Sequence, residues 1–180
     1  MGTYTIRKAE PDDCDDIVRL INELAEYENM PDQVDVTPEK LRADAFCDQP
    51  FVNLLVAVCT KSNTTVAYSS FSYTYSSWKG RTVYLDDLYV TPVHRGHGIG
   101  TTLMQSVARC AYEQKQCNRM NWIVLAWNER PKEMYARLGG ENLTVKESWE
   151  NITLFKEQLK NLATTYQVKL SADTTIDVQL

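Results

Sequence analysis

The stretch from Tyr84 to Thr102 constrains the fold more than any other part of the chain. Its first part, Tyr84 to Val90, is rich in β-branched and aromatic residues, which predicts a strand. Pro92 ends this strand, because proline has no N–H to donate to a ladder. A glycine-rich turn follows, and apolar residues spaced four apart from Ile99 onward then predict a helix.

The turn between strand and helix has the chemistry of an anion site. Glycines allow consecutive N–H groups to converge, the helix end adds a partial positive charge, and Arg95 adds a full one. Thr101 and Thr102 follow Gly100 with no lysine, which excludes a nucleotide-triphosphate P-loop. The third glycine also comes one residue too early for the dinucleotide-binding pattern. An ordinary tight turn is the alternative interpretation.

Periodicity along the rest of the chain predicts a sheet combined with helices. Strands are expected at 4–8, 54–58, 65–75, 81–90, 121–126 and 149–155, and helices at 11–28, 37–46, 99–113, 131–138 and 156–163. This order predicts an α/β (α+β) fold with a central mixed, mostly antiparallel sheet and helices on both faces. The length of 180 residues predicts one domain over 1–165, and we assign no role to the tail at 166–180.

Charge and cysteine usage narrow the class of protein. Nineteen Lys and Arg residues against 24 Asp and Glu give a net charge of -5, which disfavours a nucleic-acid partner. The five cysteines are odd in number and none forms a C-x-x-C pair, so we expect reduced thiols in the cytoplasm. With only two histidines, a metal site is not expected. No apolar run predicts a signal peptide or a membrane span.

Two carboxylates and one tyrosine are candidates for chemistry. Asp86 and Asp87 interrupt an apolar strand, and strand alternation predicts that one of them faces a substrate. A buried carboxylate needs a partner, which is either a cationic amine or one of the protein's own Arg or Lys side chains. Tyr135 lies in the helix expected after Pro131. A phenol with a pKa of about 10 is protonated at pH 7 and can act as an acid, although a core tyrosine would give the same pattern.

Several motifs together resemble the diamine acetyltransferase family, within the GNAT superfamily of N-acetyltransferases. They are Tyr27-Glu28, the turn from Ser77 to Thr82, Tyr84-Leu85-Asp86-Asp87, the loop from Arg95 to Gly100, and the segment from Trp127 to Tyr135. The resemblance extends from Tyr4 to Ala163. The turn at 78–82 and the stretch at 41–44 are more similar to the thialysine N-epsilon-acetyltransferase branch than to the spermidine/spermine branch.

The resemblance implies an acetyl-CoA-dependent enzyme that acetylates a primary amine of a small cationic substrate by direct attack, as a cytoplasmic homodimer. It implies cofactor contacts from Leu88, Tyr89, Val90, Arg95, Gly96, His97, Gly98, Ile99, Gly100, Thr101, Asn128, Glu129, Arg130 and Pro131. It implies an amine site formed by Tyr27, Glu28, Asp86, Asn121, Trp122, Ile123 and Glu147. Tyr135 would be the general acid and Asp86 the second catalytic residue.

One departure and two alternatives accompany this interpretation. The family usually has Glu-Asp where this chain has Asp86-Asp87, so the preference between thialysine and polyamines stays open. The amine could instead belong to a protein lysine or N-terminus. The chain could also be a module that binds CoA without catalysis.

Overall fold

The computed structural model describes residues 3–164. It divides into two compact units, Met1–Met134 and Tyr135–Leu180. In the described part of the chain, no helix is long and apolar enough to cross a membrane.

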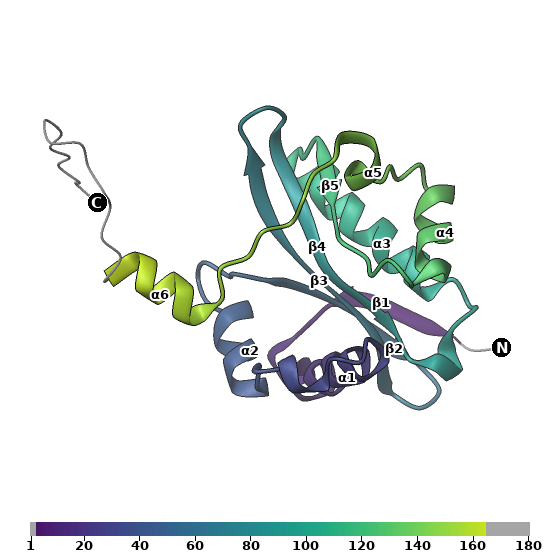
Figure 1. The fold of residues 1–180 in the computed structure, drawn as a ribbon. Helices are drawn as coiled ribbons and strands as arrows, with labels where there is room; N and C mark the ends of the chain where they lie inside the picture. The colour runs from purple at the N-terminus through teal and green to yellow at the C-terminus, as the bar shows by residue number, and fades with distance from the viewer. Residues whose placement is uncertain (1–2, 165–180) are drawn as a thin grey trace, which may run out of the picture. The chain divides into compact units, whose positions relative to one another are not determined.

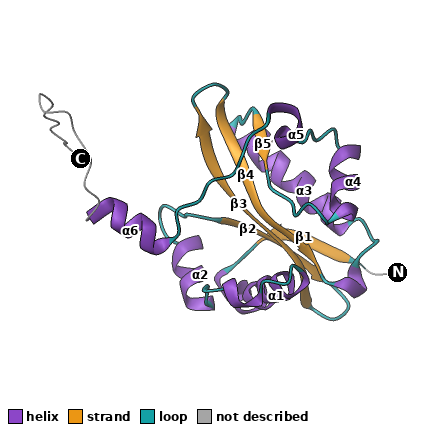
Figure 2. Cartoon of the chain, in the orientation of Figure 1, coloured by secondary structure: helices purple, strands orange, loops and turns teal. Residues whose placement is uncertain are grey.

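A five-stranded sheet is the framework of the first unit (Figures 1 and 2). Its strands are β1 (Tyr4–Lys8), β2 (Asn53–Cys59), β3 (Thr64–Ser76), β4 (Gly80–Val90) and β5 (Arg119–Asn121), in that spatial order. The first four pair antiparallel, and β5 is parallel to β4. The predicted mixed, mostly antiparallel sheet is therefore confirmed.

Helices cover both faces of this sheet. Figure 1 shows α1 and α2 on one face and α3 on the other. The elements of the first unit outside the sheet are η1 (Pro11–Asp13), α1 (Cys14–Tyr27), η2 (Pro31–Gln33), α2 (Pro38–Ala45), η3 (Pro92–His94), α3 (Ile99–Arg109) and the π-helical turn η4 (Cys110–Gln114). The helix α4 (Glu129–Arg137) begins in the first unit and ends in the second.

The core is formed where the apolar faces of α1 and α3 pack against the sheet. On one face, α1 places Ile17 and Leu20, both fully buried, against Val56 and Tyr68 of the sheet. On the other face, α3 packs against β2, β3 and β4, and its Leu103 is fully buried. Burial of such side chains contributes roughly 1.5–3 kcal/mol each, so these two layers fix the sheet between its helices.

The start of α1 is fastened to β1 by a charged pair. Arg7 donates two hydrogen bonds to Asp13, at 2.6 and 2.9 Å, and the backbone N–H of Glu10 donates a third at 2.7 Å. Burial opposes the charge of Asp13, but the bonds from Arg7 and Glu10 outweigh it and lower the pKa of this carboxyl. The pair therefore fixes where the helix leaves the sheet edge.

The expected strand at 121–126 is wrong for most of its length, because β5 ends at Asn121. Pairing between β4 and β5 stops at Tyr84, and a bulge bends β4 directly after that point. Ile123 is 64% exposed, so this apolar run does not form the expected buried strand. Residues 122–126 have the composition of a strand, but the sequence does not show that their pairing with β4 is lost.

Besides the end of α4, the second unit contains two complete helices among its described residues. The short α5 (Leu143–Glu147) begins at Asn142, whose side chain accepts from the N–H groups of Thr144 and Val145, and the sequence pattern missed this helix. The second helix, α6 (Lys156–Thr164), confirms the predicted one. The strand expected at 149–155 is wrong, because no described strand pairs with this segment. The proposed tail at 166–180 lies outside the described residues.

Candidate active site

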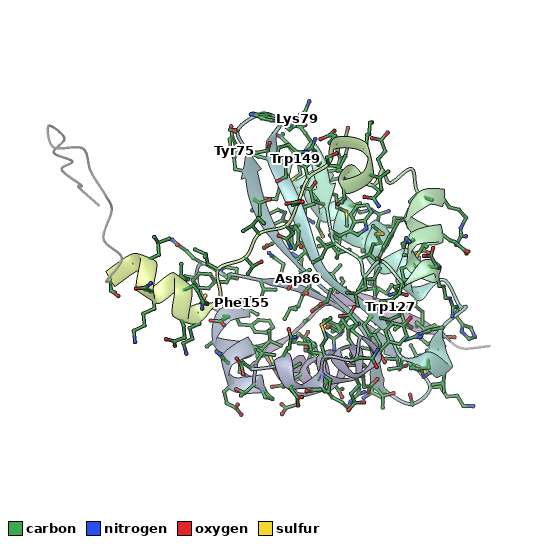
Figure 3. All side chains as sticks on the ribbon, in the orientation of Figure 1. Tyr75, Lys79, Asp86, Trp127, Trp149 and Phe155 are labelled. Carbon is green, nitrogen blue, oxygen red and sulfur yellow. The ribbon has the colours of Figure 1, made fainter. Side chains whose placement is uncertain are left out.

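A bulge in β4 positions the two carboxylates that the sequence singled out. Opposite β3, Asp87 pairs with Ser70 and Leu85 pairs with Phe71, which leaves Asp86 as the extra residue. A bulge interrupts the strict alternation of side chains. Asp86 and Asp87 accordingly line the same hollow, whereas regular alternation predicted that only one of them would face a substrate. Figure 3 shows Asp86 in the middle of the sheet, away from the hairpin tip that carries Tyr75 and Lys79.

The hollow has a volume of about 310 Å³ and lies within the first unit. It is bounded by α1, the segment that leads from η2 into α2, and the strands β2 to β4. Its apolar lining is Ile21, Val34, Val36, Leu41, Val52 and Leu54, and its polar lining is Gln33, Asp35, Ser70, Asp86 and Asp87. No Lys or Arg is among these lining residues, so the charge of its wall is negative.

Asp87 has the most perturbed carboxyl of this site. Burial and, to a lesser degree, the nearby charges of Asp86 and Glu28 raise its pKa to about 6. Hydrogen bonds from Tyr68 Oη at 3.0 Å and Ser70 Oγ at 3.2 Å partly oppose this rise. The charged form of Asp87 therefore lacks a cationic partner among the described residues.

Glu28 and Asp86 share this electrostatic setting. Glu28 follows the last residue of α1, and burial raises its pKa. Burial also raises the pKa of the Asp86 carboxyl, although the residue as a whole is exposed. Glu28 does not line the hollow, but its charge acts on Asp87. A cation bound near these three carboxyls would stabilise their charged forms.

The glycine turn has the geometry expected of an anion cradle. Gly96 and Gly98 adopt left-handed φ values of +83° and +80°, and a Cβ at either position would meet no heavy atom within 4 Å. The first hydrogen bond of α3 runs from Thr102 N to Gly98 O at 2.9 Å. The N–H groups from Ile99 to Thr101 are thus those that a helix start leaves without a carbonyl partner. A diphosphate fits this open, amide-lined end.

The side chain of Arg95 is held by contacts within the protein and is not a free surface charge. Its Nε donates to Val90 O at 2.8 Å, and its guanidinium carbon lies 5.1 Å from the ring centre of Tyr27 and 5.5 Å from that of Tyr89. The ring of His97 stays within the loop, with Nδ1 3.1 Å from Arg95 O. Arg95 therefore joins the glycine turn to α1 and to the end of β4.

The start of α4 meets the end of α1 at Asn128. This residue is 8% exposed, and its Oδ1 accepts a hydrogen bond from Tyr27 Oη at 3.0 Å. The ring of Tyr27 also packs against Trp127 at a centroid distance of 5.6 Å. Glu129 forms an ion pair with Lys132 at 2.7 Å, and Arg130 and Pro131 lie in the first turn of α4. Tyr27, predicted for the amine site, is therefore in direct contact with Asn128, predicted for the cofactor site.

One edge of β4 stays open where the sequence placed further cofactor contacts. Parallel pairing with β5 covers only Thr82 to Tyr84. Among the described residues, no strand pairs with that edge from Leu85 to Val90. This open edge includes Leu88, Tyr89 and Val90, and its backbone groups are available to an extended ligand.

Other predicted amine-site residues are not brought to the hollow. Asn121 ends β5, and Trp122 and Ile123 follow it outside the hollow's lining. Tyr135 and Glu147 belong to the second unit, where Glu147 Oε2 accepts from Trp149 Nε1 at 2.7 Å. The predicted roles of these residues remain predictions.

The sequence missed four contributors to the site. Asp35 and Gln33 come from a segment with no recognisable motif, and Tyr68 and Ser70 are hydrogen-bonded to Asp87 from the neighbouring strand. The sequence singled out Asp87 as one of two adjacent carboxylates, and the structure shows that it is more deeply buried than Asp86.

Comparisons with known proteins agree with this geometry. The model of the acetyltransferase (GNAT) family matches residues 17–140. Thialysine N-epsilon-acetyltransferase from Bos taurus is 41% identical over 169 residues, covering 91% of this chain and 99% of that protein. Spermidine/spermine N(1)-acetyltransferase-like protein 1 from Homo sapiens is 35% identical over 168 residues, covering 91% of this chain and 24% of that protein.

A solved structure is similar in fold. An integron cassette protein from the mobile metagenome of V. cholerae superposes with a TM-score of 0.71 at 22% identity, covering 90% of this chain and 98% of that one.

Proposed function

The chain belongs to the acetyltransferase (GNAT) family, and on that premise we propose that it transfers an acetyl group from acetyl-CoA to a primary amine of a small cationic substrate. The substrate class is thialysine or a polyamine such as spermidine or spermine, in keeping with the names of the relatives. The observation that carries this proposal is the bulge that aims Asp86 and Asp87 into one negatively charged hollow with an apolar wall. Such a hollow suits an alkyl chain that ends in ammonium groups.

The first unit has residues suited to hold acetyl-CoA, which supplies the thioester as acyl donor. The amides from Gly96 to Thr101 would bind its diphosphate, and the open edge of β4 at Leu88 to Val90 would pair with its extended arm. The segment from Asn128 to Pro131 would border it. The fit rests on the unpartnered amides and the open space over Gly96 and Gly98.

The carboxylates would serve the amine. A free alkylammonium has a pKa of about 10.4, so its neutral form costs roughly 4–5 kcal/mol at pH 7. A carboxylate with a pKa of about 6, as at Asp87, is charged at pH 7 and is a better proton acceptor than an ordinary one. Asp86, on the same wall, would hold the ammonium or a bridging water. Tyr135, by the family resemblance, would donate its proton to the departing sulfur.

A substrate panel tests this function. Purified protein is incubated with acetyl-CoA and spermidine, spermine, putrescine, thialysine, lysine or a lysine-containing peptide, and free thiol is measured. We expect thiol release with the small amines and little with the peptide, because the hollow is only about 310 Å³. Release with the peptide alone would favour a protein acetyltransferase. Calorimetric binding of CoA with no release for any amine would favour the non-catalytic module.

Asp35 provides a test of the hollow that is separate from the catalytic pair. The substitution Asp35→Asn removes one negative charge from the lining and should raise the KM for spermidine about two- to fivefold, as expected for one solvent-screened charge pair. Asp32→Asn is the matched control, since Asp32 lies three residues earlier, in η2, and does not line the hollow. Equal KM values for the two variants would contradict a role of this hollow in amine binding.

The glycine turn gives a prediction about stability. Gly98→Ala should lower the free energy of unfolding by roughly 1–2 kcal/mol, because alanine is strained at a φ of +80°. Gly100→Ala is the matched control: this residue lies inside α3, and its Cβ would meet Val90 at an ordinary 3.7 Å. Thermal or denaturant unfolding should therefore show a loss for the first variant and none for the second. Equal losses would contradict the assigned backbone geometry.

We also propose a homodimer in a reducing compartment such as the cytoplasm. The dimer follows from the family resemblance, and the five free cysteines support the compartment. Sedimentation velocity tests the dimer, and a mass consistent with one chain of 20.6 kDa at micromolar concentration would contradict it.

A further inference from the structure

The guanidinium of Arg95 is shared between the two substrate sites. The residue belongs to the glycine turn, yet its side chain reaches the ring of Tyr27 at the end of α1, 5.1 Å away, and the ring of Tyr89, 5.5 Å away. Its Nε is engaged by Val90 O at 2.8 Å. A planar cation held by one backbone carbonyl and two aromatic rings is fixed in orientation.

Each of the two tyrosines is held in turn by a second partner. Tyr27 Oη donates to Asn128 Oδ1 at 3.0 Å, and its ring packs on Trp127. Tyr89 Oη donates to Glu23 Oε2 at 3.2 Å, and Glu23 is paired with Arg19 one turn earlier in α1. Arg95 is therefore the link between the turn that would bind the diphosphate and the helix end that carries Glu28.

The usual role of an arginine in such a turn would be to bind phosphate directly. The observed contacts favour a different one, because Nε already donates to Val90 O and the guanidinium carbon lies over the rings of Tyr27 and Tyr89. A phosphate ligand can be a point charge, so lysine often replaces arginine there. Lysine has a single nitrogen, which would have to donate to Val90 O and also lie over both rings, whereas the guanidinium divides these contacts among its atoms.

We propose that Arg95 is a positioning residue that couples the amine site to the cofactor site through Tyr27. The inference rests on the proposed function, since it assigns both sites as above. When the turn is ordered around a diphosphate, Arg95 holds Tyr27 and the end of α1 in place, and the amine meets a preformed wall. By thermodynamic reciprocity, the amine must then also tighten the binding of CoA.

Steady-state kinetics of Arg95→Lys provide the first test. We expect the KM for spermidine to rise about tenfold, as two cation–π contacts are lost, and the KM for acetyl-CoA to change less than about threefold. Arg109→Lys is the matched control, because Arg109 is the exposed last residue of α3 and pairs with Glu113, which has no proposed role. A rise in the KM for acetyl-CoA with an unchanged KM for spermidine would overturn the inference and make Arg95 a phosphate ligand.

Calorimetry provides a readout that a merely structural role would not change. The Kd of CoA is measured with and without saturating spermidine; the wild type should bind CoA several-fold more tightly with the amine, and Arg95→Lys should show almost no difference. Coupling retained in Arg95→Lys would overturn the inference. Because this is a binding measurement, it decides the inference even if the wild type releases no thiol, an outcome that would contradict the proposed function instead.

A double-mutant cycle guards against a variant that is simply misfolded. Tyr27→Leu removes the ring that receives Arg95, and we expect it to raise the KM for spermidine by itself. If Arg95 acts through Tyr27, adding Arg95→Lys to Tyr27→Leu should raise the KM little further, so the two effects are not additive. Additive effects would contradict a shared pathway. Melting temperatures of all variants identify any that fail to fold.

Discussion

Replacing Tyr135 with phenylalanine is expected to lower kcat by about 10²–10⁴-fold, the usual contribution of a general acid. The change removes a single oxygen, and with it the proton proposed for the departing sulfur. The Kd of CoA should stay within about twofold, because the glycine turn and the open edge of β4, which would bind the cofactor, belong to other elements. Initial rates of thiol release and calorimetric titration with CoA measure the two quantities.

Tyr112→Phe is the control for Tyr135→Phe. Tyr112 is 76% exposed in the π-helical turn after α3, so the same atom is removed at a site with no proposed role. This control should keep the wild-type kcat. An unchanged kcat in Tyr135→Phe would exclude Tyr135 as the acid, and a large rise in the Kd of CoA would instead make it a binding residue.

Asp87→Asn should make the protein more stable at neutral pH and much less active. The pKa of Asp87 rises from 3.8 to about 6 on folding, so between these values the folded protein binds more protons than the unfolded chain. Stability therefore falls as pH increases from about 4 to 6, and the full penalty, up to about 3 kcal/mol, persists above that range. Asparagine removes this penalty while its Oδ1 can still accept a hydrogen bond from Tyr68 or Ser70.

The stability effect has a distinct pH signature. The Tm of Asp87→Asn should exceed that of the wild type by as much as roughly 6–12 °C at pH 8, and the difference should vanish near pH 4. Asp32→Asn, an exposed carboxylate on η2, should show no such pH-dependent gain. An equal Tm for Asp87→Asn and wild type at pH 8 would contradict the buried, destabilising charge.

Activity gives the second signature of Asp87. The kcat/KM of the wild type should rise with pH through about 6, as Asp87 loses its proton and becomes able to accept one. In Asp87→Asn this acidic limb should be absent, and kcat/KM at pH 7.5 should be lower by about 10²-fold or more. If the variant keeps the limb, another group carries it, and Asp86 is the first to examine.

Local patterns allowed most of the first unit to be predicted. The strands near Tyr4, Leu54 and Thr65, the hairpin into Val90 and the helix after the glycine turn all appear as expected, because alternation, helical spacing and glycine act over a few residues. Thr37 and Pro38 start α2 as expected too, with Thr37 Oγ1 accepting from Lys40 N at 3.3 Å.

The errors arose where a remote partner decides the structure. The bulge at Asp86 depends on how β4 pairs with Ser70 and Phe71 of β3, which no pattern within β4 reveals. The run at 122–126 has the composition of a strand but loses its neighbour once β4 bends. The segment at 149–155 likewise alternates without a partner among the described strands.

In the candidate site too, features set by local sequence could be predicted and features set by distant residues could not. The glycine turn and the pair Asp86 and Asp87 could be predicted as site residues because their residue types are unusual for their positions in the sequence. The direction of the Arg95 side chain was not, since it is set by Tyr27 and Tyr89, which are distant or on another element. The hollow was missed for the same reason: its walls come from five separate segments of the chain.

The open edge of β4 also affects the tendency of the protein to aggregate. An uncovered strand edge is a template on which another polypeptide can add a strand and begin aggregation. In the described part of the chain this edge is short, and the bulge at Asp86 twists it where it opens. A long flat strand cannot align with such an edge, whereas a thin single-chain ligand can. The irregularity that points two carboxylates into one space thus also protects against unwanted self-association.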